Sequence, residues 1–278
     1  MIGRDSWRRL FRQPLALGGG GIVVIVAVVG SCANLLAPYD PMSQDLYSRL
    51  QPPSLGHIFG TDDFGRDVFS RIIHGSLISI RIGVVTVLAA AVIGTMLGLW
   101  SGYKGGWSDV FIMRFVDIML AFPSILLAIA IVAITGPGIN NVIFAVSVVL
   151  IPQFARIVRS SVLAIKALPF VEAEEAMGAG KLRILIFAIL PNCMAPLVVQ
   201  STLSMGTAIL DAAGLSFLGL GAQPPMPEWG AMLAGGRSLI LEAPWIMTFP
   251  GLSIFILVLS FNLFGDGLRD ALDPKINA

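Results

Sequence analysis

Charged residues are scarce in this 278-residue chain: Asp, Glu, Lys and Arg together make up only 13% of it. A soluble domain carries about twice that share, because its surface faces water. Hydrophobic residues account for 56% and the mean hydropathy is +0.85, which excludes a soluble enzyme and a disordered chain. The net charge is only +1, so the basic surface of a nucleic-acid-binding protein is absent. The composition indicates a membrane protein.

Cysteine and histidine are also scarce, with two residues of each. Cys32 and Cys193 lie in apolar runs, so we interpret them as unpaired small hydrophobic residues, and a disulfide-stabilised fold is excluded. The phosphate-binding loop Gly-x-x-x-x-Gly-Lys-Ser/Thr does not occur in the sequence. We therefore expect no ATP site, no catalytic residue and no resident metal.

Long uncharged runs predict six crossings of a membrane. Each crossing needs about 20 apolar residues, because a helical residue rises about 1.5 Å and the hydrocarbon is about 30 Å thick. Four runs fit one crossing each, whereas 118–155 fits two, with the turn-forming Gly136-Pro137-Gly138 near its middle. The predicted spans are 15–37, 82–102, 116–135, 139–156, 190–211 and 245–265.

Lysine and arginine predict the orientation of the chain. With a cytoplasmic N-terminus, 13 of the 18 basic residues lie in inner segments. The positive-inside rule therefore places both termini, and the loop between the fourth and fifth spans, in the cytoplasm. The first apolar run exceeds the core length of a cleaved signal peptide, so we interpret it as an uncleaved span.

Ionisable residues before the second span raise the question of a metal site; they are His57, Asp62, Asp63, Asp67 and His74. A structural role is the alternative. Asp62–Arg66 and Asp67–Arg71 are spaced four apart with the acid first, the favourable order for ion pairs on a helix. We therefore expect solvated ion pairs on an amphipathic helix that leads into the second span.

Two acids lie at the ends of predicted spans, where ionisable groups are candidates for function. Asp117 follows Arg114 by three residues, which predicts an ion pair within one helix at the cytoplasmic interface. Asp211 lies at the outer end of the fifth span, and we expect it to cap or pair rather than to contact cargo.

The loop after the fourth span contains a predicted short helix. Pro169 suits its first position, and Gly178 suits the left-handed residue beyond its end. Phe170, Ala173 and Met177 share one face, opposite Glu174 and Glu175. Glu172 lies in the first turn, where a negative charge complements the helix dipole. Because helices that lie on lipid favour Lys and Arg, the acidic face favours docking onto a cytoplasmic partner.

The same loop resembles the signature loop of permease subunits of ATP-binding-cassette importers. That signature is Glu-Ala-Ala, three residues, Gly, and later Ile-x-Leu-Pro. The chain matches it at Glu172-Ala173, Gly178 and Leu190-Pro191, and departs from it at Glu174 and Ala188. The resemblance implies a helix that couples the permease to an ATPase, through Phe170, Glu172, Ala173, Glu174, Met177 and Gly178.

Four further motifs, in order along the chain, resemble the C-type permease subunit of dipeptide, oligopeptide and nickel importers. They are Phe59–Arg71, Leu215–Gly221, Pro227–Gly230 and Phe261–Asp270. Residues 191–196 and 221–225 are most similar to the dipeptide branch. Peptides are therefore the expected cargo, and nickel is the alternative.

The resemblance implies an all-α membrane protein with six transmembrane helices of the type I ABC importer permease class. Its expected parts are an interfacial segment with the first transmembrane helix (1–37), an extracytoplasmic loop (38–75), the transmembrane domain (76–266) with its coupling loop (157–189), and a cytoplasmic tail (267–278). The expected location is the bacterial inner membrane, with contacts to membrane lipid and none to nucleic acid.

The resemblance also implies partners. They are a B-type permease subunit that forms a heterodimer with this chain, two ATP-binding subunits, and an extracytoplasmic substrate-binding protein. This chain then forms half of the translocation pathway, and the ATPase subunits hold ATP and magnesium.

The outer segment 212–242 is rich in Gly and Pro and too short for a crossing, so we expect it to seal the pathway, with Phe217 and Leu220 as gate residues. A self-sufficient secondary transporter or channel is the alternative from another class. Such a protein needs ionisable groups near the midplane, and the spans offer only Asp117 at their boundary.

Overall fold

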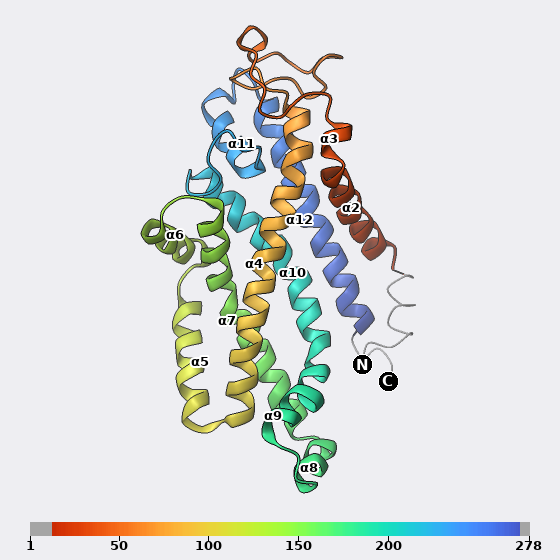
Figure 1. Cartoon of the computed structure of the whole chain (residues 1–278), viewed down its shortest axis with the longest axis vertical. Coiled ribbons are helices and arrows are strands. Elements are labelled where there is room, and N and C mark those ends of the chain that lie inside the picture. Colours follow the sequence, from red (N-terminus) through yellow and green to blue (C-terminus); the bar gives the residue numbers. More distant parts are fainter. Residues whose placement is uncertain (1–12, 273–278) are drawn as a thin grey trace.

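The computed structural model describes residues 13–272, in which every regular element is helical. Figure 1 shows the helices arranged along one long axis, with the loop before α4 at one end and α8 at the other. The predicted all-α membrane fold is confirmed. The elements are α2 (Pro14–Ser31), α3 (Ala33–Leu36), η1 (Leu46–Ser48), α4 (Val68–Lys104), α5 (Gly106–Ala121), α6 (Ser124–Thr135), α7 (Ile139–Lys166), α8 (Pro169–Ala176), α9 (Lys181–Arg183), η2 (Ile184–Ile189), α10 (Leu190–Phe217), α11 (Trp229–Gly236), η3 (Arg237–Leu239) and α12 (Trp245–Leu272).

Five continuous helical segments are long and apolar enough to cross a membrane: α2, α4, α7, α9 to α10, and α12. The third predicted span, 116–135, is wrong as a single helix, because α5 and α6 meet at an angle of 97°. Phe122 is extended at the break, and Pro123 precedes α6. The residue before a proline is disfavoured in the α conformation, which explains why the helix ends here.

The helices extend beyond their predicted apolar spans. α4 begins at Val68, within the segment predicted as an extracytoplasmic loop (38–75), and α12 continues to Leu272, within the predicted tail (267–278). Asp67 caps α4 by accepting a hydrogen bond from the Ser70 amide at 2.8 Å, which satisfies one of the free amides at a helix start. The predicted interfacial segment at residues 1–12 and the final residues 273–278 lie outside the described range.

Close packing of α4 against α7 forms the centre of the bundle. A Cβ added at Gly94 would lie 2.5 Å from the Phe154 Cβ, and one added at Gly98 would lie 2.6 Å from the Ala155 carbonyl oxygen. Only glycine allows this approach of two helices. The facing residues of α7, including Phe154 and Val158, are fully buried.

The first helix lies at the edge of the bundle. α2 packs mainly on α12, where a Cβ at Gly19 would lie 2.6 Å from the Ser260 carbonyl oxygen. Its large side chains, such as Val24 and Ile25, are mostly exposed. This exposure is compatible with a bilayer, because lipid tails solvate apolar side chains as well as a protein core does.

Candidate functional site

The short helix α8 forms where the sequence predicts it. Leu168 is extended and Pro169 occupies the first helical position, where the absence of an N–H costs nothing because that amide has no partner within the helix. Glu172 lies in the first turn, close to the positive end of the helix dipole. Figure 1 places α8 at the end of the molecule, beyond α9 and the turn between α4 and α5.

A glycine ends α8 in a defined way. Gly178 has φ +81°, and its amide donates to the Glu175 carbonyl oxygen at 3.0 Å. The amide of Ala179 donates to the Glu174 carbonyl oxygen, also at 3.0 Å. This pair of bonds is a Schellman motif, which satisfies carbonyls left free at the end of a helix and needs a left-handed residue.

One face of α8 is anchored to the bundle. The side chain of Val171 is buried against it. The hydroxyl of Tyr103, near the end of α4, donates to the Glu175 carboxylate at 3.2 Å, and Lys166 Nζ donates to the Tyr103 backbone oxygen at 2.8 Å. These contacts link α8 to the ends of α4 and α7.

The opposite face of α8 projects away from the bundle. Phe170, Ala173 and Met177 are exposed, Met177 to 78%. The acidic residues do not share one environment, since Glu172 is exposed and Glu174 is half-buried. Glu175 is exposed as well, so the surface of α8 that projects from the bundle carries both apolar and acidic side chains.

A groove of about 730 Å³ lies at the C-terminal end of α10, between α6, α11 and α12. Phe217 lines this groove, as do apolar residues of α12 such as Ile254. Asp211 faces the same groove, and within residues 13–272 it has no hydrogen bond or ion pair, contrary to the predicted cap or pair. A carboxylate at the centre of the hydrocarbon costs about 2.5–3.5 kcal/mol, so an unpaired acid near the end of a span favours water or a polar partner beside it.

The second predicted gate residue lies elsewhere. Gly219 has φ +80° and turns the chain, and Leu220 is packed against the core rather than lining the groove. The Leu220 carbonyl oxygen accepts a hydrogen bond from the Gly138 amide at 3.0 Å. The structure thus places Phe217 at the groove and Leu220 at the junction with the α6–α7 turn.

Four ionisable residues before and at the start of α4 are buried, namely Asp62, Arg66, Asp67 and Arg71, so the prediction of solvated pairs on a helix is wrong. Asp62 pairs with Arg66 at 2.6 Å in a turn before α4, and Arg71 approaches Asp62 at 3.7 Å. Asp67 caps α4 and contacts His57 Nδ1 at 2.9 Å. Among residues 13–272, these groups form no cluster able to hold a metal ion.

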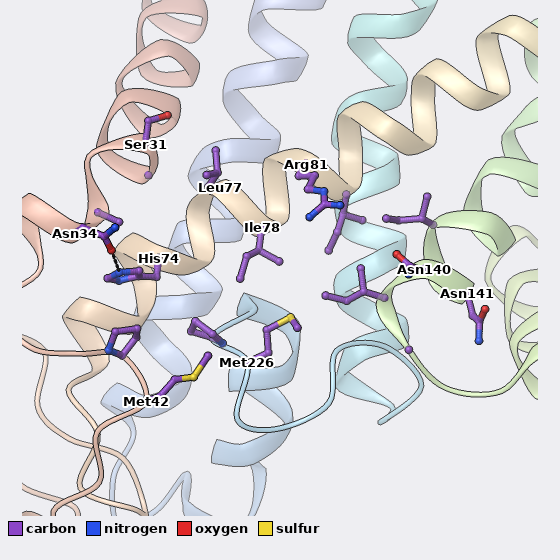
Figure 2. Close-up of a pocket in the computed structure, with 18 of the residues that line it drawn as sticks. Ser31, Asn34, Met42, His74, Leu77, Ile78, Arg81, Asn140, Asn141 and Met226 are labelled. Atoms are coloured by element: carbon purple, nitrogen blue, oxygen red, sulfur yellow. Dashed lines mark hydrogen bonds between the residues drawn. The ribbon is translucent and has the colours of Figure 1, made fainter.

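A second cavity, of about 940 Å³, lies between α2, α3, α4, the start of α7 and the loop at Met226. Figure 2 shows Arg81, Asn140 and Met226 around it, together with His74, whose Nε2 lies 3.2 Å from the Asn34 Oδ1. Arg81 is exposed and follows the buried outer part of α4. Its guanidinium gives the cavity a positive side that no sequence pattern indicated.

Other residues that organise these sites also lack a local signal. Asp117 pairs with Arg156 of α7 at 2.5 Å, not with Arg114 as predicted. Glu228 caps α11 by accepting bonds from the amides of Gly230 and Ala231 at 2.9 and 2.8 Å. Burial raises the pKa of Glu228, while the two amides oppose that shift. Of these residues, only Glu228 could have been identified from the sequence, as an acid directly before a helix start.

Two family models match the chain. Residues 94–278 match the binding-protein-dependent transport system inner membrane component, and residues 2–53 match the N-terminal transmembrane domain of oligopeptide transport permease C. The first match covers most of the helical bundle, including α8 and the groove at Phe217.

Relatives of known name match over almost the whole length. The chain is 50% identical to the dipeptide transport system permease protein DppC of Alkalihalophilus pseudofirmus, over 99% of this chain and 90% of that protein. It is 50% identical to the glutathione transport system permease protein GsiD of Pectobacterium atrosepticum, over 99% and 92%. The di/tripeptide transport system permease protein DppC of Pseudomonas aeruginosa is 46% identical, over 98% and 92%.

The fold matches a solved structure, the inward-facing MetNI methionine ABC transporter, with a TM-score of 0.59 over 73% of this chain and 96% of that chain, at 23% identity. The fold is therefore that of an importer permease. Taken together with the family models and the relatives, the chain belongs to the binding-protein-dependent transport system inner membrane components, as a C-type permease subunit of the dipeptide/oligopeptide class of ATP-binding-cassette importers.

Proposed function

We propose that this chain carries small peptides inward across the bacterial inner membrane, as half of a pathway completed by a B-type permease subunit. The support is the identity of about half of all residues to permeases named for dipeptides, di/tripeptides and glutathione. These cargoes share a free ammonium group, carboxylate and amide bonds. Nickel is the alternative cargo.

The proposed assembly contains two ATPase subunits and an extracytoplasmic binding protein besides the two permeases. ATP and magnesium belong to the ATPase subunits, because this sequence has no phosphate-binding loop. Both termini then lie in the cytoplasm, on the side of α8. The distribution of Lys and Arg supports this orientation.

The coupling element is α8, which transmits closure of the ATPase subunits to the bundle. The observation that carries this proposal is a short helix that exposes both apolar and acidic side chains, while Val171 and Glu175 anchor it to the bundle and to α4 and α7. A push on α8 then moves the ends of two long helices, which is how a local contact can tilt a bundle between inward and outward openings.

The test uses two substitutions in α8, Gly178→Leu and Glu172→Lys, in the full complex. Membrane insertion should stay intact, whereas co-purification of the ATPase subunits and peptide uptake should fall. Glu242→Lys makes the same charge change on an exposed acid of the outer loop before α12 and should leave both unchanged. Normal uptake by both α8 variants would exclude this helix as the coupling element.

The groove at Phe217 is the proposed outer part of the pathway, with Phe217 lining it and Leu220 acting as a gate residue from the adjacent junction with the α6–α7 turn. Cysteines introduced at these two positions should be labelled at different rates with and without ATP and binding protein. Cys32 is replaced first, because it is only half-buried and would react with the label. Cys193 is fully buried and stays in place as an unlabelled control. Equal labelling in both states would argue against gating here.

Cargo is tested by uptake into cells that express the complete transporter. A labelled dipeptide should accumulate, and labelled nickel should not. In vesicles, this chain alone should move nothing, because the motor lies in other subunits. Concentrative uptake by the isolated chain would instead select the secondary-transporter alternative.

A further inference from the structure

A positively charged cavity of about 610 Å³ lies beside α8, where α4 and α7 end and α9 begins. Three lysines from these three helices line it: Lys104, Lys166 and Lys181. Glu175 is the one acid among its described lining residues, and its carboxylate accepts a hydrogen bond from the Tyr103 hydroxyl. The cavity therefore suits an anion.

The lysines differ in how they are held. The Lys166 ammonium group is held by Tyr103: it donates to the Tyr103 backbone oxygen at 2.8 Å and lies 5.1 Å from the centre of the Tyr103 ring. Lys104 lies 5.1 Å from the centre of the Trp100 ring. Within residues 13–272, neither Lys104 nor Lys181 forms an ion pair. Two ammonium groups are thus available to a ligand.

The cavity lies at the level of lipid headgroups. The uncharged part of α4 between Arg81 and Lys104 is about 33 Å long at about 1.5 Å per residue, which matches a hydrocarbon thickness of about 30 Å. Lys104 therefore marks one boundary of the hydrocarbon. Trp100 lies one turn inside this boundary and is 53% exposed, as expected of an indole at a membrane interface.

Apolar surface continues from the cavity toward the hydrocarbon. Leu182, at the rim, is 69% exposed, and Leu185 lines the wall. A free phosphate would contact only the lysines, whereas a phospholipid covers the charged and the apolar parts together. Basic pockets between helices at the cytoplasmic boundary are suited to anionic headgroups.

We propose that this cavity binds the phosphate headgroup of an anionic phospholipid, with its acyl chains against Trp100 and Leu182. The site goes beyond the transport function, because its occupant is a component of the membrane and not cargo. Its ligand would bridge α4, α7 and α9, of which α4 and α7 hold α8 in place, without touching the exposed Met177.

The test measures lipid retained by the purified full complex in nanodiscs of phosphatidylcholine with a minor fraction of phosphatidylglycerol. Removing two lysines, in the variant Lys104→Gln/Lys181→Gln, should weaken retention of phosphatidylglycerol by about 30-fold, at about 1 kcal/mol for each basic residue. The control is Arg114→Gln/Arg183→Gln, which removes two exposed cations that do not line the cavity, and it should retain the lipid.

Two further measurements separate loss of the site from other causes of lost lipid. Lys104→Arg/Lys181→Arg keeps both charges and should restore retention, which separates loss of the site from misfolding. Added inorganic phosphate should not displace the lipid. Equal retention by the glutamine variant, equal loss in the Arg114/Arg183 control, or displacement by phosphate would each overturn the proposal. None of these readouts depends on peptide uptake.

Discussion

The carboxylate of Asp62 lies 2.6 Å from the Arg66 guanidinium, and both side chains are less than one-tenth exposed. The other Asp62 oxygen accepts bonds from the amides of Phe64 and Arg66 at 2.9 and 3.0 Å. This single acid therefore organises the turn that precedes α4. Removing one partner of a buried pair leaves the other charge without compensation.

Asp62→Ala should destabilise the outer loop by about 3–5 kcal/mol for that reason. Asp63→Ala is the matched control, because the Asp63 side chain is 31% exposed and lies 3.7 Å from Arg66, and it should cost less than about 1 kcal/mol. The measurement is the fraction of complex that stays folded in detergent after heating. Equal loss of folded complex in both variants would show that the buried Asp62–Arg66 pair adds no more stability than the exposed Asp63.

Gly98→Val should disrupt the packing of α4 on α7. A Cβ there already lies 2.6 Å from the Ala155 carbonyl oxygen and 2.7 Å from the Val158 Cβ, so the helices must separate, at a cost of about 1–3 kcal/mol or more. Gly21→Val meets nothing within 4 Å and should be neutral. Thermal unfolding of the two variants side by side checks this, and similar midpoints would contradict it.

Gly178→Ala should loosen the end of α8 without a clash, because nothing lies within 4 Å of the added Cβ. The cost of about 1–2 kcal/mol comes from the left-handed backbone alone. Hydrogen exchange of the amides of Gly178 and Ala179 should speed up accordingly. Gly180→Ala, at φ −66°, should leave the exchange unchanged, and faster exchange there would point to a general disturbance of the loop.

Glu228 predicts a pH dependence of stability. Burial raises its pKa above the ordinary value of 4.5, so the folded chain binds this proton more tightly than the unfolded chain. The stabilising contribution is complete below about 4.5 and declines as pH rises through the folded pKa. The unfolding temperature of the unsubstituted protein should therefore fall relative to Glu228→Gln as pH increases. A gap that is constant or moves the other way would contradict this, and Glu242→Gln controls for the loss of one charge.

If Asp211 contacts the ammonium group of the peptide, Asp211→Asn should reduce peptide uptake about 10- to 150-fold, because one charged hydrogen bond is worth about 1.5–3 kcal/mol. Stimulation of ATP hydrolysis by the loaded binding protein should persist, since α8 and its contacts are untouched. Asp211→Glu keeps the charge and should retain uptake. Full uptake by the asparagine variant would remove Asp211 from the pathway.

The sequence could predict the features that depend on local chemistry. Uncharged runs located the membrane helices, and Pro169 and Gly178 located both ends of α8, because each residue acts through its own backbone. The break between α5 and α6 had a local signal in Phe122-Pro123 as well, but the continuous apolar run outweighed it in the prediction.

Features that join distant segments could not be predicted in this way. Arg71 donates to the Pro41 and Pro225 carbonyl oxygens, and Asp117 finds its partner on α7 instead of on its own helix. Spacing of four residues favours a pair only if both lie on a helix, and Asp62 precedes α4. Tertiary contacts therefore decided which acids were paired, and left the Asp211 carboxylate without a partner among residues 13–272.

The uninterrupted length of α4 has a mechanical consequence. This one helix of about 55 Å carries Arg71, from the buried outer network, near its first turn and Tyr103, which holds α8, near its last. A rigid rod of that length converts a tilt of about 5° into a displacement of about 5 Å at its far tip. A force applied at the α8 end of this helix is thereby delivered to the loop before its first turn, with no separate relay between them.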